Sequence, residues 1–209
     1  MKIIKPDVEF LTPVDGVAII KHLELCGRVC YKSEEKISED SAQKFLTNII
    51  KRGHEAVLEH FSFTVKFICD RGVSHEIVRH RLASYCQEST RYCNYSKDSF
   101  GSEITVIKPL FLEEGTKGWD SWKHSCEVAE TEYFNFLDWG YTAQEARSVL
   151  PNSLKTEVVM TADIREWRHF LKLRCSPAAH PQMREVALIL LDKVQSRIPV
   201  LFDDIKEVI

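Results

Sequence analysis

The sequence lacks the glycine-rich motifs by which many proteins hold a phosphate group. Its eight glycines are dispersed along 209 residues, and neither G-x-x-x-x-G-K-[ST] nor G-x-G-x-x-G occurs. A nucleotide bound to this chain would therefore have to be held by side chains rather than by the backbone amides of a glycine-rich loop.

Long apolar runs and an excess of positive charge are also missing. No stretch approaches the roughly 18 apolar residues of a membrane-spanning helix, and Pro6 and Asp7 interrupt the first ten residues, which therefore do not read as a secretion signal. We expect a cytoplasmic protein that does not bind a membrane. The net charge of −3 argues against a general nucleic-acid binder, which usually has a basic excess.

Cysteine pairs of the kind found in disulfide frameworks or zinc fingers are absent too. The seven cysteines are odd in number and scattered, which favours reduced thiols. His54 and His60 are similar to the histidine pair of a zinc-binding helix, but that pair requires a spacing of four residues, and position 58 is Leu58. We therefore predict no metal site.

The composition that is present is typical of a folded domain. Hydrophobic residues make up 44% and charged residues 28% of the chain, and its length allows a substantial hydrophobic core. No repeat or linker interrupts residues 1–209, so we predict a single domain. Strand and helix patterns do not alternate regularly, which favours the α+β class, here with an antiparallel sheet core and long amphipathic helices.

Hydrophobic periodicity predicts the individual elements. Apolar and polar residues alternate over 61–69, which predicts the clearest strand. The segment from 71 to about 83 is predicted to be a helix, on which Arg79 and Arg81 would point in nearly opposite directions. Further strands are predicted at 8–11, 104–107 and 158–161, and further helices after an N-cap at Asp15 and over 41–51, 119–137, 142–150, 164–173 and 181–198.

One short segment concentrates groups that bind anions. Residues 79–92, RHRLASYCQESTRY, contain three arginines, a histidine and two serines. Hydroxyl and guanidinium groups together commonly hold a phosphate. A solvated helix face crossed by ion pairs is the alternative, but Tyr85 and Tyr92 interleave with the polar groups, and four more arginines follow between residues 147 and 174. The residues alone thus predict a site for one or two anionic small molecules.

Arg79-His80-Arg81, followed after seven residues by Ser89, resembles the signature of the flavin-dependent thymidylate synthases. Three other segments resemble parts of the same family in its order and spacing. They are Gly53-His54-Glu55 with Glu59-His60, the stretch Ala146 to Pro151, and the stretch Arg165 to Arg174 with His180 after it. The resemblance spans roughly residues 53–195.

This resemblance implies an enzyme that makes dTMP from dUMP. Methylenetetrahydrofolate would donate the carbon, and FAD reduced by NADPH would supply the hydride. It also implies an α+β homotetramer whose active sites are each built from several subunits. Because hydride from the flavin activates the uracil ring in this family, we expect no cysteine, including Cys86 and Cys93, to act as a nucleophile.

Two readings from other classes stay open beside the enzyme. A non-catalytic nucleotide-binding module or regulator would keep the dUMP pocket but carry out no chemistry. Binding of RNA through the arginines and tyrosines of residues 79–92 is disfavoured by the net charge. Binding of FAD, which would colour the protein yellow, separates the enzyme from both.

The resemblance also implies roles for individual residues. Arg174 would be catalytic and face the uracil ring, while Ser89 and Arg91 would lie near the phosphate of dUMP. FAD would be bound by His54, Ala56, Glu59, Arg79, His80, Arg81, Gln87, Asp163, Ile164, Arg165 and His169. The substrate dUMP would be bound by Glu76, Arg79, Gln87, Glu88, Ser89, Thr90, Arg91, Arg147 and Arg174.

Overall fold

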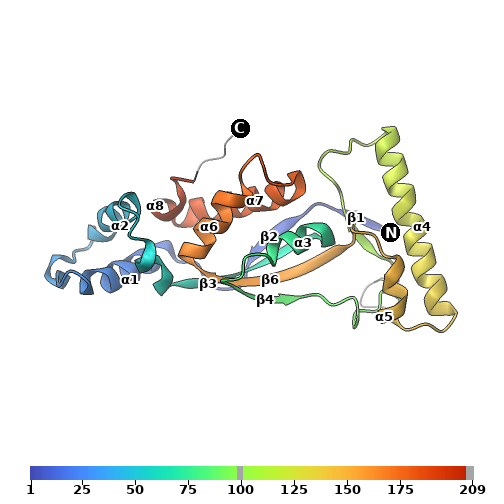
Figure 1. The fold of residues 1–209 in the computed structure, drawn as a ribbon, viewed down its shortest axis with the longest axis horizontal. Helices are drawn as coiled ribbons and strands as arrows, with labels where there is room; N and C mark the ends of the chain where they lie inside the picture. The colour runs from blue at the N-terminus through green and yellow to red at the C-terminus, as the bar shows by residue number, and fades with distance from the viewer. Residues whose placement is uncertain (98–100, 206–209) are drawn as a thin grey trace. The chain divides into compact units, whose positions relative to one another are not determined.

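Four strands form one sheet of the computed structural model, which describes residues 1–97 and 101–205. Their order is β2-β3-β6-β4 (Figure 1), and the fold mixes helices with antiparallel sheet, as predicted. A two-stranded parallel sheet pairs β1 (Lys2–Ile4) with β5 (Thr105–Ile107). The four strands of the larger sheet are β2 (Asp7–Phe10), β3 (Ser62–Asp70), β4 (Ser84–Gln87) and β6 (Lys155–Asp163).

Alternating burial explains why β3 and β6 are strands. Phe63, Val65 and Phe67 of β3 are at most 1% exposed, and polar residues between them face the other way, which confirms the strand predicted at 61–69. β6 is longer than the predicted 158–161. Its alternating burial extends back to Thr156, which is fully buried. The hydroxyl of Thr156 accepts a hydrogen bond from Gln87 Nε2 at 3.3 Å, which offsets the cost of burying it.

The chain divides into two compact units. The first unit comprises Met1–Asp7, Phe67–Arg79 and Cys86–Val158, and the second comprises Val8–Lys66, His80–Tyr85 and Val159–Ile209. Strands β3, β4 and β6 each contribute residues to both units. The assignment of residues 1–209 to a single domain stays a prediction.

The first unit is built around its long helix. Helix α4 (Lys117–Asp138) begins after Thr116, whose side chain accepts a hydrogen bond from the Trp119 N–H. It buries Cys126 and Tyr133 against a cluster that includes Val106 of β5. The unit's other helical segments are α3 (Arg71–Ile77), the short helix α5 (Ala143–Ala146) and the 3-10 turn η4 (Arg147–Val149).

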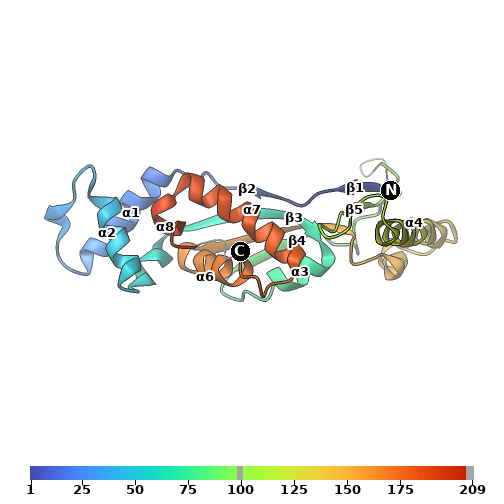
Figure 2. The ribbon, with the colours of Figure 1, turned by 90° about the horizontal axis from the view of Figure 1, so that it is seen from above.

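The second unit packs a helix, α6, against its share of the sheet. In α6 (Ile164–Arg174) the ring of Trp167 stacks on Phe63 of β3 at 5.0 Å and donates a hydrogen bond to the Phe63 carbonyl. Helices α6 and α7 lie side by side (Figures 1 and 2). The remaining elements are α1 (Gly16–Val29), η1 (Glu34–Lys36), α2 (Ser41–Lys51), η2 (Glu55–His60), α7 (Pro181–Arg197) and α8 (Pro199–Phe202).

The predicted helix from 71 to about 83 is wrong beyond Ile77, where α3 ends. His80 turns into the interior, where 5% of its surface remains exposed. The hydroxyl of Tyr85 donates to the His80 carbonyl at 2.6 Å, an acceptor that a continuing helix would have used for the backbone N–H four residues on. Arg79 and Arg81 are therefore not on opposite faces of one helix.

The other predicted helices are confirmed with small shifts of their ends, except that 142–150 is divided into the four-residue α5 and the 3-10 turn η4. Asp15 caps α1, accepting hydrogen bonds from the N–H groups of Val17 and Ala18, and Pro181 stands in the first turn of α7. Among the described residues, no helix combines the length and the apolar character needed to cross a membrane.

Gly16, the first residue of α1, is predicted to be irreplaceable for steric reasons. A Cβ atom at this position would lie 1.9 Å from the backbone oxygen of Arg197, at the end of α7. We expect Gly16→Ala to lower the free energy of unfolding by about 1–3 kcal/mol, measured by urea denaturation. Val17→Ala is the control, because Val17 is 60% exposed. A Gly16→Ala protein as stable as the control would contradict the close approach of α1 to α7.

Candidate functional site

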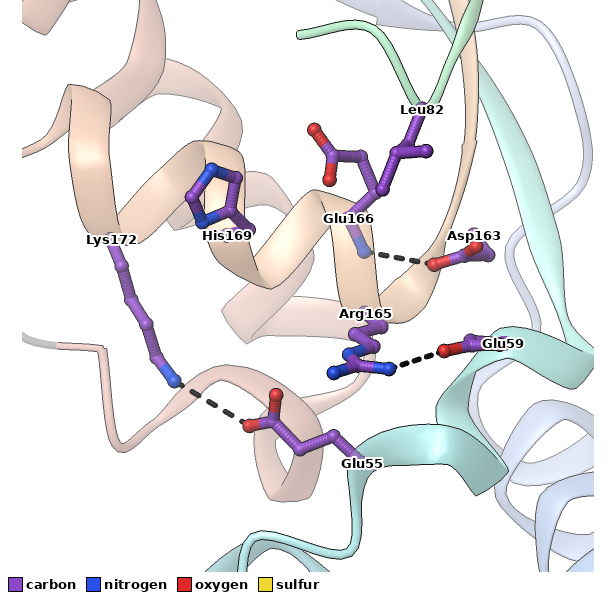
Figure 3. Close-up of a pocket in the computed structure, with 8 residues that line it drawn as sticks. All are labelled: Glu55, Glu59, Leu82, Asp163, Arg165, Glu166, His169 and Lys172. Atoms are coloured by element: carbon purple, nitrogen blue, oxygen red, sulfur yellow. Dashed lines mark hydrogen bonds and ion pairs between the residues drawn. The ribbon is translucent and has the colours of Figure 1, made fainter.

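A cavity of about 650 Å³ in the second unit is lined by side chains from three segments, and all of them except Leu82 are charged or titratable (Figure 3). One segment is η2, the second is the loop that precedes β4, and the third runs from the end of β6 into α6. We call it the α6 cavity. Its lining residues are Glu55, Glu59, Leu82, Asp163, Arg165, Glu166, His169 and Lys172.

The α6 cavity brings together four residues predicted to bind FAD. Arg165 and Glu59 form an ion pair in which Nη1 and Oε1 are 2.5 Å apart. Asp163 caps α6, its side chain accepting the N–H of Glu166 at 2.8 Å, and His169 is exposed on the next turn. Glu59 thus lines the same cavity as three residues that follow it by more than one hundred positions in the sequence.

Four lining residues were not among the residues predicted to bind FAD, although the sequence held a spacing signal for two of them; they are Glu55, Leu82, Glu166 and Lys172. Glu166 and Lys172 lie three positions before and after His169, so a helix places all three on nearly the same face. Glu55 stands in the Gly53-His54-Glu55 segment that resembles the family, but no spacing signal assigned it a role. Its position follows from two contacts of 3.6 Å, with Lys172 Nζ and Arg168 Nη2.

His80 lies buried behind the α6 cavity and is hydrogen-bonded through both ring nitrogens. Arg174 Nε donates to His80 Nε2 at 3.1 Å, and His80 Nδ1 lies 3.2 Å from Glu166 Oε1. A guanidinium can only donate, so Nε2 is the acceptor and Nδ1 carries the proton toward Glu166. The imidazole is therefore neutral and held in one tautomer.

Electrostatics support the neutral form of this pair. Burial, aided by the charges of Arg174 and His169, lowers the pKa of His80 to about 4. Burial also raises the pKa of Glu166, with a smaller contribution from Asp163. Because both shifts disfavour the charged forms, the contact between His80 and Glu166 is a hydrogen bond of a neutral imidazole rather than a strong ion pair.

The same cluster has a spacing that a metal ion could use. His80, Glu166 and His169 each offer one ligand atom, and these atoms lie within 4.8 Å of one another. A metal ion would need a lone pair of the His80 ring, but Nε2 accepts from Arg174 and Nδ1 carries the proton toward Glu166. The absence of a metal from the site stays a prediction.

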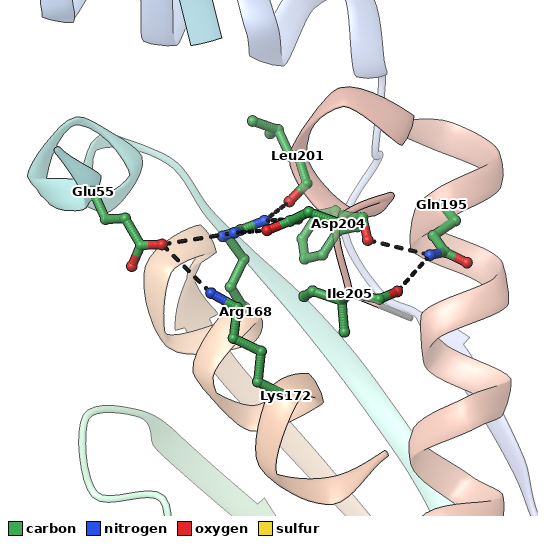
Figure 4. Close-up of polar contacts among 8 residues, drawn as sticks. Glu55, Arg168, Lys172, Gln195, Leu201, Asp204 and Ile205 are labelled. Atoms are coloured by element: carbon green, nitrogen blue, oxygen red, sulfur yellow. Dashed lines mark hydrogen bonds and ion pairs between the residues drawn. The ribbon is translucent and has the colours of Figure 1, made fainter. Parts of the chain in front are cut away.

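Arg168 connects Glu55 of the α6 cavity wall to the segment after α8 (Figure 4). It is 1% exposed and donates to both carboxylate oxygens of Asp204, at 2.7 and 2.6 Å, and to the Leu201 carbonyl. Burial would raise the pKa of Asp204, but the hydrogen bonds and charge of Arg168 lower it. The segment after α8 is thereby anchored to α6, and the same guanidinium faces Glu55.

A second cavity, of about 230 Å³, lies in the first unit and contains two of the residues predicted to bind dUMP. Arg147 Nη1 donates to Thr90 Oγ1 at 3.5 Å. Arg71, which the sequence did not single out, also lines it, and its Nη1 is buried without a hydrogen-bond partner among the described residues. Two guanidinium groups and a hydroxyl at one small cavity suit an anion.

The other predicted dUMP residues of the segment after β4 have protein partners. Gln87 Nε2 donates to Ser74 Oγ at 3.0 Å, and Glu88 accepts from Lys155 Nζ at 3.0 Å. Arg91 is exposed and donates to Gln144 Oε1 at 3.1 Å. Ser89 accepts the Arg91 N–H through its hydroxyl at 3.3 Å, and the roles of both residues at the phosphate stay predictions.

Several predicted site residues line neither of these two cavities. Ile164 is fully buried and its N–H donates to the Phe61 carbonyl at 3.0 Å, so its side chain serves the core. The others include exposed residues of η2, of the turn before it and of the loop after α3, and the partly buried Glu76 of α3. Their ligand-binding roles stay predictions for His54, Ala56, Glu76, Arg79 and Arg81.

Comparison with known proteins shows the family. The family model described as thymidylate synthase complementing protein matches residues 19–200. The flavin-dependent thymidylate synthase of Pyrococcus furiosus is 32% identical over 198 residues, covering 94% of this chain and 78% of that protein. The one from Geobacter sulfurreducens is 34% identical over 202 residues, covering 90% and 85%.

A solved structure shows the same fold. The UMP/dUMP methylase PolB from Streptomyces cacaoi, bound with 5-Br dUMP, superposes with a TM-score of 0.77 at 24% identity, covering 97% of this chain and 96% of that chain. The chain belongs to the family of flavin-dependent thymidylate synthases. The enzyme class predicted from the R-H-R segment, a flavin-dependent methyltransferase, is thereby confirmed.

The buried His80 predicts how stability depends on pH. Its pKa falls from 6.5 to about 4 on folding, so between these values the unfolded chain binds a proton that the folded chain does not. Stability contributed by neutral His80 is therefore full above pH 6.5 and is lost as the pH falls toward 4. Urea unfolding at about pH 7 and about pH 5 should show a smaller loss for His80→Gln than for wild type.

The control for this experiment is His124→Gln, because His124 is exposed on α4. It should lose as much stability as the wild type between the two pH values. Equal losses for the wild type and His80→Gln would show that His80 titrates alike in the folded and unfolded chains.

Proposed function

We propose that this chain converts dUMP to dTMP with methylenetetrahydrofolate as carbon donor and NADPH as the reductant of a bound FAD. Besides family membership, one feature of the structure supports this proposal. The α6 cavity, lined by four predicted flavin residues, backs onto a buried histidine that fixes the predicted catalytic Arg174. Assembly as a homotetramer with shared active sites is part of the same proposal.

The donor set of the α6 cavity fits FAD. Arg165 is exposed and suits the diphosphate, which is a double anion. The carboxylates of Glu59 and Asp163 are acceptors that suit the hydroxyl groups of the ribityl and ribose parts. When bound, FAD would supply the hydride that reduces the substrate ring.

Arg174 is proposed to face the uracil ring of dUMP. Negative charge builds on the uracil carbonyl as the ring reacts, and a guanidinium held in place beforehand stabilises that charge without reorganising. His80 supplies the positioning by accepting from Arg174 Nε at 3.1 Å. With a pKa of about 4, His80 is neutral near pH 7 and neither repels Arg174 nor serves as a general acid.

The phosphate of dUMP is assigned to the segment after β4. Ser89 and Arg91 supply a hydroxyl and a guanidinium, and Thr90 and Arg147 meet at the 230 Å³ cavity of the same unit. Cys93, in the same segment, is an unsuitable nucleophile because burial raises the pKa of its thiol. This supports a reaction in which no cysteine attacks the ring.

The proposed function is tested by assaying purified protein in the absence of oxygen. Purified protein should be yellow, or should change the absorbance of added FAD. It should then oxidise NADPH in the presence of dUMP and methylenetetrahydrofolate and release dTMP, identified by chromatography. A protein that binds dUMP but neither takes up FAD nor makes dTMP would instead be a non-catalytic nucleotide-binding module.

Replacing Arg91 and Arg174 by alanine should affect different properties of the enzyme, substrate affinity in one case and catalytic rate in the other. Arg91 would hold a phosphate whose charge does not change during the reaction, so Arg91→Ala should weaken dUMP binding and leave the saturated rate less affected. Arg174→Ala should keep FAD and most of the dUMP affinity but lose roughly 10²- to 10³-fold in rate. Arg174→Lys should recover little, because an ammonium cannot replace the planar fork.

The measurement pairs dUMP affinity, read from the flavin spectrum, with the single-turnover rate of flavin oxidation. The opposing hypothesis for Arg174 is a cation at the C-terminus of α6, worth only about 0.3–1 kcal/mol of stability. Oxidation of reduced flavin by Arg174→Ala at the wild-type rate, with dUMP and folate bound, would favour that hypothesis.

A further inference from the structure

A third cavity, of about 290 Å³, lies in the second unit, and its lining within residues 1–97 and 101–205 includes three cations and no acidic residue. It is formed by the end of α1, the turn that follows, η1, and one face of α2. We call it the α1–α2 cavity. Its lining residues are Arg28, Tyr31, Ser33, Lys36, Phe45, Asn48, Ile49 and Arg52.

Backbone geometry builds this cavity. After α1 the chain reverses through Lys32, whose φ of 47° lies in the left-handed region, and the Ser33 N–H bonds back to the Arg28 carbonyl at 3.2 Å. On the other side, a Cβ atom at Gly27 would lie 2.6 Å from the ring of Phe45. Glycine at this position lets Phe45 of α2 pack directly against the backbone of α1 and form an apolar wall.

The three cations of the α1–α2 cavity differ in their pairing. Arg28 donates twice to Glu24, a residue that is 1% exposed, and its guanidinium lies 4.6 Å above the ring of Phe45. Its charge is therefore compensated. Lys36 and Arg52 are exposed and form no ion pair with any part of the chain that the structure describes. Two uncompensated cations thus face a cavity with aromatic walls.

Tyr31 connects this cavity to the proposed flavin site. Its hydroxyl lies 3.1 Å from Nδ1 of His54, the residue that precedes η2. The next residue, Glu55, and Glu59 of the same turn line the α6 cavity. A ligand in the α1–α2 cavity would therefore contact the side chain that holds the start of the α6 cavity wall.

We propose that the α1–α2 cavity binds the anionic group of a co-substrate that also carries a flat ring. Lys36 and Arg52 bind the anion, and Tyr31 and Phe45 offer ring faces for stacking. This proposal rests on the proposed function, in which two co-substrates have this chemistry. One is NADPH, through its 2′-phosphate, and the other is methylenetetrahydrofolate, through its glutamate carboxylates.

Kinetics of the FAD-loaded enzyme carrying both Lys36→Ala and Arg52→Ala test the proposal. The apparent KM is measured for NADPH and for NADH, which lacks the 2′-phosphate, and for methylenetetrahydrofolate with one and with three glutamates. Removing a charge-assisted contact should raise one KM about tenfold. A rise for NADPH but not NADH assigns the site to the dinucleotide, and a rise that grows with glutamate number assigns it to the folate.

Two controls separate this proposal from the proposed function. Lys44→Ala removes an exposed cation of α2 that does not line the cavity, and it should leave every KM unchanged. The double variant should keep its FAD, its dUMP affinity and its rate at saturating co-substrates. Unchanged KM values for all four compounds would overturn the proposal, whereas a wild-type protein that makes no dTMP would contradict the proposed function itself.

If the double variant loses its FAD, Lys36→Glu alone is used in its place. Lys36 lies in the three-residue turn η1 and makes no described side-chain bond, so its replacement should not affect folding. Reversal of its charge should raise the same KM, and an unchanged KM would count against the site.

Discussion

A neutral histidine that is hydrogen-bonded on both ring nitrogens is the constraint on which the second unit's site depends. Burial lowers the pKa of His80 to about 4, and this leaves Nε2 free to accept from Arg174. The opposite nitrogen meets Glu166, a residue of the α6 cavity wall. The predicted catalytic arginine and the predicted flavin cavity are thus connected through one buried ring.

The same histidine determines the local fold. Turning His80 inward ends α3, and the bond from Tyr85 to the His80 carbonyl starts the chain into β4. Arg168 is held by the side-chain carboxylate of Asp204 and faces Glu55 of the cavity wall. Buried charges of this kind are destabilising when they lose one partner, so the cavity wall and the segment after α8 are expected to be stable only together.

The periodicity of the sequence was sufficient to predict those elements whose structure depends on residues close together in the chain. The alternation in β3, the N-cap Asp15 and the helix over 41–51 follow from neighbouring residues, and the structure confirms them. The end of α3 could not be predicted, because the residue that draws His80 inward is Glu166, 86 positions away. Such tertiary contacts override local helix preference.

The same distinction applies to the site. The R-H-R segment and its companions identified the family and four residues of the α6 cavity. Glu166 and Lys172 could have been found from their three-residue spacing around His169. Arg71 could not, because only the structure shows its guanidinium at the same cavity as Thr90 and Arg147.

The position of the proton on His80 can be observed directly by ¹⁵N spectroscopy of histidine-labelled protein. Long-range ¹H–¹⁵N correlations distinguish the two neutral tautomers and the charged ring, and the His80→Gln variant assigns the signal. The structure predicts a His80 ring that stays neutral, with its proton on Nδ1, between about pH 5 and pH 8. A ring protonated on Nε2, or one that titrates near its ordinary pKa of 6.5, would contradict the account of how Arg174 is held.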